Sequence, residues 1–103
     1  MAIVEASQGC IAVRGPLTFA TARQVRAEGL QAISNASTEE LQVDCAAVEQ
    51  SDSAGLAVLL DWLAEARRRN LSLRFANLPA RLLAIAQISE IEETLAARAA
   101  KAG

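Results

Sequence analysis

Histidine is absent from this sequence of 103 residues, and so is tyrosine. Without histidine, neither a Ser-His-Asp triad nor a Cys-His pair can form, and the commonest metal ligand is missing. Among the twelve acidic residues, the groups considered for acid–base chemistry are a cluster of Asp44, Glu49 and Asp52 and the pair Glu92-Glu93, and neither group has a substrate-positioning residue beside it in the sequence. We therefore expect no catalytic residue, no metal and no cofactor.

Several other features are scarce. Aromatic residues make up only 3% of the chain, so we expect a thin, aliphatic core. The net charge of −2 and the pI of about 5.1 argue against nucleic acid as a partner. No apolar run approaches the roughly 20 residues of a membrane span, and residues 1–5 do not resemble a signal peptide, so a cytoplasmic chain without membrane insertion is expected. The two cysteines, Cys10 and Cys45, are expected to be free and to pack as small hydrophobic residues.

The most informative stretch is residues 50–63, where a short apolar strand at 41–46 leads through a polar turn into a long helix. Asp52 and Ser53 stand where N-cap residues belong, because their oxygens can accept hydrogen bonds from free helix N–H groups. At about 100° per residue, one face of this helix is a leucine stripe that forms the expected core face: Leu56, Leu59, Leu60 and Leu63. Ala54, Val58 and Trp62 lie off this stripe, and we expect them to form an uncovered apolar patch that docks a partner.

Periodicity predicts strands at residues 3–6, 10–14, 41–45 and 71–76, and helices at 21–34, at 54–69, after Pro79 and from about residue 90. Gly15-Pro16 is expected to end the second strand, and Thr18 or Thr21 to cap the first helix. The order β-β-α-β-α-β-α-α predicts an α/β fold, with one domain over residues 1–103. We expect a mixed sheet of four strands, or five, with about four helices, and a frayed tail at 96–103.

Ser53 has two interpretations. A serine at this place is commonly only a cap. Phosphorylation there, however, would add about −1.5 to −2 charges at the positive end of the helix dipole, which the fold would tolerate and a neutral docking face would not. Gly55 also opens a helix after a strand, but no glycine-rich run surrounds it and no lysine follows, so nucleotide binding is not expected.

Residues 52–60, which read Asp-Ser-Ala-Gly-Leu-Ala-Val-Leu-Leu, resemble the signature of STAS domains, the family of anti-sigma-factor antagonists, whose motif is D-[ST]-x-G-L-x-x-L-L. Residues 14–18 are similar to the family's entry into its first helix. Residues 73–79 and 82–88 resemble the stand-alone MlaB-like STAS subunit of the phospholipid-trafficking ABC transporter of Gram-negative bacteria. The resemblance implies that Ser53 is the phosphorylatable or interface hydroxyl, framed by Asp52 and Gly55. Sigma-factor antagonists often carry a second hydroxyl directly after it, where this chain has Ala54.

The resemblance implies a non-enzymatic adaptor that binds the cytoplasmic ATPase subunit of an ABC transporter acting in outer-membrane lipid asymmetry. Such a chain would lie at the inner membrane through its partner. The alternative is an anti-sigma-factor antagonist that binds a serine kinase and releases it when Ser53 is phosphorylated. For either function we expect one set of interface residues: Asp52, Ser53, Ala54, Gly55, Val58 and Trp62.

Overall fold

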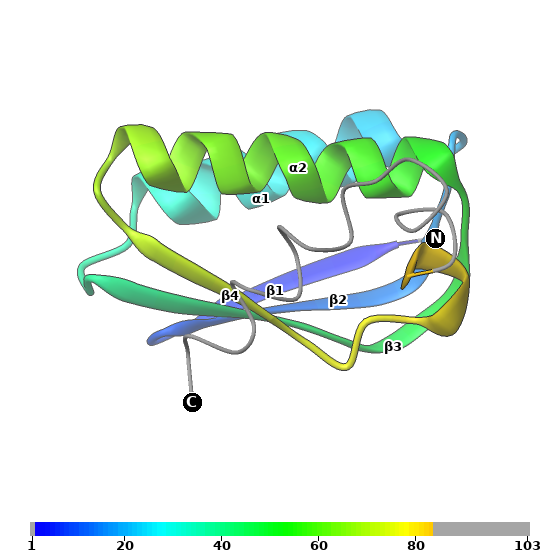
Figure 1. Cartoon of the computed structure of the whole chain (residues 1–103), viewed down its shortest axis with the longest axis horizontal. Helices are drawn as coiled ribbons and strands as arrows, with labels where there is room; N and C mark the ends of the chain where they lie inside the picture. Colours follow the sequence, from blue (N-terminus) through cyan, green and yellow to red (C-terminus); the bar gives the residue numbers. More distant parts are fainter. Residues whose placement is uncertain (1, 84–103) are drawn as a thin grey trace.

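The computed structural model describes residues 2–83, which form a sheet with two long helices packed on one face (Figure 1). The strands are β1 (Ile3–Ser7), β2 (Cys10–Leu17), β3 (Glu40–Ser51) and β4 (Ser72–Ala76), in the spatial order β1-β2-β3-β4. The helices are α1 (Ala22–Ser34) and α2 (Ser53–Arg68). The expected α/β fold with a mixed four-stranded sheet is confirmed.

The strand pairing follows from the connections between strands. β1 and β2 form an antiparallel hairpin whose turn contains Gly9 at φ +77°, a left-handed conformation that suits glycine. β2 and β3 pair in parallel across α1, and β3 and β4 pair in parallel across α2. Helical crossovers are the usual way to join parallel neighbours, so the predicted mixed sheet is realised as expected.

β2 does not end at Gly15-Pro16, as the sequence analysis expected, but runs on to Leu17. β1 pairs with β2 only as far as Arg14, so Pro16 has no neighbouring strand on that side. The N–H that proline lacks is therefore not needed for a hydrogen bond between strands. β3 is longer than expected as well, because it follows β2 until Leu17 stands opposite Ser51. The two extensions bring the starts of α1 and α2 to the same end of the sheet.

The core lies between the helices and the sheet. In β3 the side chains of Leu41, Val43 and Cys45 are buried, which confirms the period-two alternation predicted there. Cys10 and Cys45 are both free thiols, and burial raises the pKa of the Cys45 thiol to about 12. Asn70 follows Arg69, the C-cap residue of α2, and has φ +58°, the left-handed conformation expected of a residue that ends a helix.

Thr21 occupies the N-cap position of α1, but its side chain does not cap the helix. Its hydroxyl donates to the Pro16 carbonyl at 2.8 Å and accepts from the Thr18 N–H at 3.1 Å. Thr21, one of the two threonines expected there, is therefore the N-cap residue by position, but its hydroxyl closes the turn that precedes the helix instead of accepting from a helix N–H.

After β4 the chain turns at Asn77 and becomes helical over residues 80–83, where the Pro79 carbonyl accepts from the N–H groups of Leu82 and Leu83. This confirms the start of a helix after Pro79, and Leu82 is buried in the core. The remainder of that helix, the helix expected from about residue 90 and the tail at 96–103 lie outside the described residues.

Candidate functional site

The Asp52 side chain joins the start of α2 to the turn between β2 and α1. One carboxylate oxygen, Oδ1, accepts from the N–H groups of Ala54 at 2.9 Å and Gly55 at 3.1 Å, which makes Asp52 the N-cap. The other oxygen, Oδ2, accepts from the Phe19 N–H at 3.0 Å. These bonds, with the Phe19 N–H contributing most and nearby Arg81 adding attraction, hold the pKa of Asp52 below its usual value. Asp52 therefore stays ionised at neutral pH and ties two segments together.

Gly55 lets the first turn of α2 sit directly against the end of β2. A Cβ built at this position would lie 2.3 Å from the Leu17 carbonyl oxygen, which is far inside van der Waals contact. Any residue other than glycine would force the helix away from the strand. The glycine of the D-[ST]-x-G motif thus has a packing role rather than a phosphate-binding one.

Ser53 is the first residue of α2 and is exposed. Within residues 2–83, its hydroxyl has no hydrogen-bond partner, because the neighbouring Asp52 performs the capping. Ala54 beside it is half-buried and Ala57, one turn further along α2, is exposed. The N-terminal turn of α2 therefore presents a free hydroxyl among small side chains, a surface to which a partner protein or a kinase has access.

Val58 and Trp62 are not part of an exposed surface, so the expected apolar patch is wrong. Their side chains are 2% and 0% exposed. The indole of Trp62 lies under α1 against Gly29, where an added Cβ would overlap the ring, and its Nε1–H donates to the Arg26 carbonyl at 3.2 Å. The reason is that α2 has two neighbours, the sheet and α1. The leucine stripe faces the sheet, whereas Trp62 is covered by α1 and Val58 is buried in the core.

Phe19 is the residue that the sequence analysis missed. Its side chain is 85% exposed in the turn between β2 and α1, and its backbone N–H is bonded to Asp52 beside Ser53. Next to this turn lies a pocket of about 440 Å³. Its lining residues are Thr18, Glu49, Gln50, Ser51, Asp52, Pro79 and Arg81. Periodicity carries no signal for a single apolar side chain in a turn, so the sequence pattern does not single out this residue.

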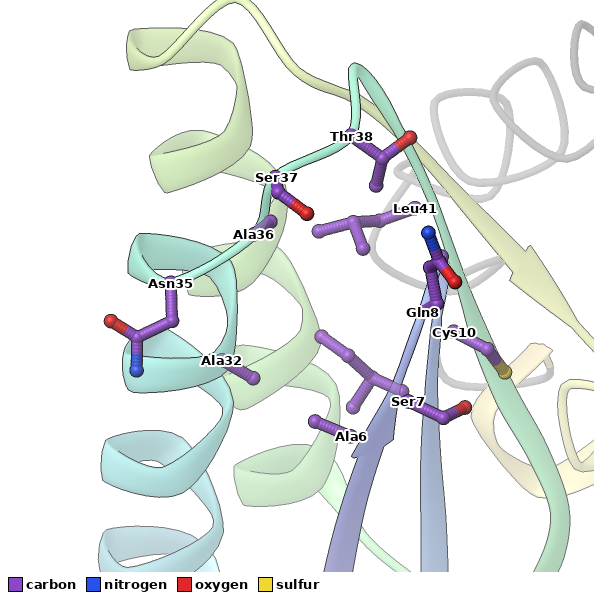
Figure 2. Close-up of a pocket in the computed structure, with 12 residues that line it drawn as sticks. Ala6, Ser7, Gln8, Cys10, Ala32, Asn35, Ala36, Ser37, Thr38 and Leu41 are labelled. Carbon is purple, nitrogen blue, oxygen red and sulfur yellow. The ribbon is translucent and has the colours of Figure 1, made fainter.

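A second pocket, of about 240 Å³, lies at the other end of α1, between that helix and the β1–β2 turn (Figure 2). Its lining includes the apolar side chains of Ala6, Ala32 and Leu41 and the polar side chains of Asn35 and Thr38. Among the residues that the structure describes, neither a carboxylate nor an amino group lines it, and the sulfur of Cys10 points away from its centre (Figure 2).

Two further classes of site are not found among the described residues. In residues 2–83, no three His, Cys, Asp or Glu side chains gather closely enough to hold a metal ion. Within the same part of the chain, neither helix has the length and apolar character that crossing a bilayer requires.

The fold is shared with several solved structures. The anti-sigma factor antagonist SpoIIAA in its unphosphorylated form matches with a TM-score of 0.64 at 18% identity, over 85% of this chain and 83% of that one. A putative anti-sigma factor antagonist from Thermotoga maritima matches with a TM-score of 0.73 at 11% identity, over 92% and 83%. A sulfate transporter family protein from Wolinella succinogenes matches with a TM-score of 0.65 at 18% identity, over 88% and 75%.

No curated protein matches the sequence itself. A protein-family model described as the Mlab STAS domain matches residues 3–97, which is most of the chain. The motif at residues 52–60, the sheet order and this match agree with one another. The chain belongs to the MlaB-like STAS domain family.

Proposed function

We propose that this chain is a one-domain, non-catalytic adaptor that binds the ATPase subunit of a lipid-transporting ABC complex. The contact is made by the first turn of α2, with Ser53 at its centre. The observation that carries the proposal is the exposed Ser53 hydroxyl. Asp52 caps the helix, so this hydroxyl is not used for capping. Ser53 also stands in the signature motif of a family whose model is named for Mlab. Through this partner the chain would lie at the cytoplasmic face of the inner membrane.

Each of the interface residues expected from the sequence has a distinct role in this proposal. Ser53 and Ala54 contact the partner. Asp52 and Gly55 shape the turn, because one caps the helix and the other allows its close approach to β2. Trp62 packs against α1 and Val58 lies in the core, and neither takes a direct part in the contact, since both are buried.

The test is a tagged pull-down from native membranes with the wild type and Ser53→Glu side by side. A glutamate at the first position of a helix suits the helix dipole, so the fold should survive while the charged side chain blocks a neutral contact. Ala64→Glu is the matched control, because it adds the same charge to an exposed position on the same helix, about 16 Å along its axis. We expect the ATPase with the wild type and the control, and at least a tenfold lower yield with Ser53→Glu.

The outcomes separate the parts of the proposal. Recovery of the ATPase by Ser53→Glu at the wild-type yield would place the contact elsewhere. Absence of the ATPase from every sample would reject the transporter function, and recovery of a soluble serine kinase in its place would favour the alternative below.

The second candidate is a partner switch, in which a serine kinase phosphorylates Ser53 and thereby ends the interaction. The observation in its favour is the exposed hydroxyl at the start of α2, together with the similarity in fold to SpoIIAA, whose structure in the phosphorylated form matches at 18% identity with a TM-score of 0.66. Incubation with ATP and each candidate kinase, followed by intact mass spectrometry, tests it. The mass of one phosphate on the wild type, but not on Ser53→Ala, would support this function over the adaptor.

A further inference from the structure

We propose that Phe19 is the principal anchor of the partner interface, and that the partner supplies an apolar pocket for the Phe19 ring, with a basic side chain beside that pocket. The proposal rests on the adaptor function proposed above and names a contact residue outside the α2 motif. Large apolar side chains that reach solvent within residues 2–83 are Ile3, at 49%, and Phe19, at 85%. Phe19 is the more exposed of the two, and its backbone is bonded to the residue next to Ser53.

The turn that carries Phe19 is fixed in place before any partner arrives. The Thr18 and Thr21 backbones are bonded to each other at 3.0 Å, and the Thr21 hydroxyl closes the same turn on the Pro16 carbonyl. Asp52 adds the bond from the opposite side, to the Phe19 N–H. An aromatic side chain on a rigid backbone loses few degrees of freedom on binding, because only its two side-chain torsions are immobilised. Such side chains dominate the binding energy of many interfaces.

The surroundings of Phe19 indicate what the partner must provide. The bond from the Phe19 N–H to Asp52 brings this turn to the start of α2, where Ala54 and Ala57 are small, and Ala20 next to Phe19 is small as well. Within residues 2–83, these neighbours leave a projecting ring and offer no large apolar side chain that could line a recess for one. The apolar pocket that receives the ring must therefore belong to the partner. Among the described residues, the pocket next to this turn is lined by the carboxylates of Glu49 and Asp52 and by the guanidinium of Arg81, so the charge balance of these groups is negative. A lysine or arginine of the partner would complement it.

The same charge balance separates a protein partner from a membrane. An exposed phenylalanine can also enter a bilayer, but anionic headgroups attract basic clusters, and this pocket carries more acidic than basic groups. One projecting ring is also too small an area for a stable dimer of this chain, which needs several hundred square ångströms on each copy, roughly 800 Å² in a standard interface. A partner protein with a preformed apolar pocket therefore agrees best with the charge and size of this surface.

The experiment measures affinity for the purified ATPase subunit by isothermal titration, with Phe19→Ala, Phe19→Leu and the control Ile3→Ala. Ile3 is also exposed, and its strand partner is Arg14, so it lies on the sheet face away from α1 and α2. We expect Phe19→Ala to weaken binding about 30-fold, as truncation of an interface hot spot does, and Phe19→Leu to weaken it less. Ile3→Ala should bind as the wild type does. Glu49→Lys should weaken binding, and the loss should shrink at high salt.

The thermal unfolding midpoint of each Phe19 variant should equal that of the wild type, because the ring is in solvent. Wild-type affinity in Phe19→Ala would overturn this inference and leave the adaptor function standing. If the wild type does not bind the ATPase, the adaptor function fails, and the titration is repeated with the serine kinase that phosphorylates Ser53. If Phe19→Ala then binds the kinase as tightly as the wild type does, or if the wild type does not bind the kinase either, the inference is overturned as well.

Two further arms address the other occupants. Binding of the wild type, but not of Phe19→Ala, to vesicles of phosphatidylglycerol and phosphatidylethanolamine would assign the ring to a membrane. A dimer that light scattering detects for the wild type and not for Phe19→Ala would assign it to a second copy of this chain. Either result overturns the inference.

Discussion

Gly29→Ala provides the most direct test of how α1 and α2 pack. Alanine is the better helix former by about 1 kcal/mol, so helix propensity alone predicts a gain in stability. The structure predicts the opposite, because an added Cβ would lie 2.0 Å from two ring atoms of Trp62 and 2.5 Å from its nitrogen. Carbon atoms in ordinary contact are about 3.5–4.0 Å apart, so the ring or the helix would have to move by more than 1 Å.

The magnitude follows from how little freedom Trp62 has. Its side chain is fully buried, and its Nε1–H is bonded to the Arg26 carbonyl, so the ring has no empty space to enter. Overpacking of this kind costs about 3 kcal/mol at the upper end of its usual range, and loss of the indole hydrogen bond costs about 1 kcal/mol more. After the gain in helix propensity, we expect Gly29→Ala to lower the free energy of unfolding by about 3 kcal/mol. In a domain of this size that corresponds to a fall in Tm of about 12–24 °C.

Urea unfolding followed by far-ultraviolet circular dichroism measures this change. Ala27→Gly, at an exposed position of the same helix, is the control and should cost only about 1 kcal/mol through helix propensity. In Gly29→Ala/Trp62→Phe the smaller ring relieves the overlap, so the two substitutions should couple by at least about 1 kcal/mol. A Gly29→Ala variant that is as stable as the wild type, or more stable, would refute the packing described for Trp62 and restore the exposed patch expected from the sequence.

Two more predictions concern the start of α2. Because the pKa of Asp52 is lowered in the folded chain, its carboxylate adds stability that is fully present above its unfolded pKa of about 3.9 and is lost as pH falls through the folded value. Asp52→Asn should therefore flatten the fall in unfolding free energy below about pH 4, whereas an unchanged acid profile would count against the three bonds to this side chain. Asp44 and Glu65, whose pKa values are also lowered, contribute to the slope that remains. Gly55→Ala should lower the free energy of urea unfolding by about 2–3 kcal/mol, since its Cβ would meet the Leu17 carbonyl oxygen, a backbone atom that cannot rotate away. A loss below about 0.5 kcal/mol would show that the helix does not approach β2 so closely.

Much of the fold could be predicted from the sequence because each element satisfies local rules. Alternation marks β3 and β4, the cap marks the start of α2, and the leucine stripe marks the helix face that packs on the sheet. Strand ends were less predictable. Whether Pro16 ends β2 depends on which side of the strand has a neighbour, and a single strand does not carry that information.

The candidate site could be predicted only in part, for a similar reason. A helical wheel assigns Val58 and Trp62 to water when the sheet is taken as the only neighbour of α2. The signal for a second neighbour was present in Gly29, since a glycine inside a helix commonly marks the close approach of another group, here the indole. Phe19 gave no such signal, because its importance depends on the bond that brings its turn to Asp52 from 33 residues away in the chain.

The burial of Trp62 also changes how binding data on this chain should be interpreted. Trp62→Ala leaves a cavity between α1 and α2 and should cost about 3–5 kcal/mol, a large part of the stability of a small domain. Such a variant would lose its partner because the turn that carries Phe19 and the start of α2 are no longer held together. Phe19→Ala should bind the partner about 30-fold more weakly while keeping the stability of the wild type. Binding that is lost in Trp62→Ala and regained at low temperature, where the variant refolds, would therefore assign Trp62 to the scaffold, whereas loss of binding by a fully folded Trp62→Ala would place the indole in the interface.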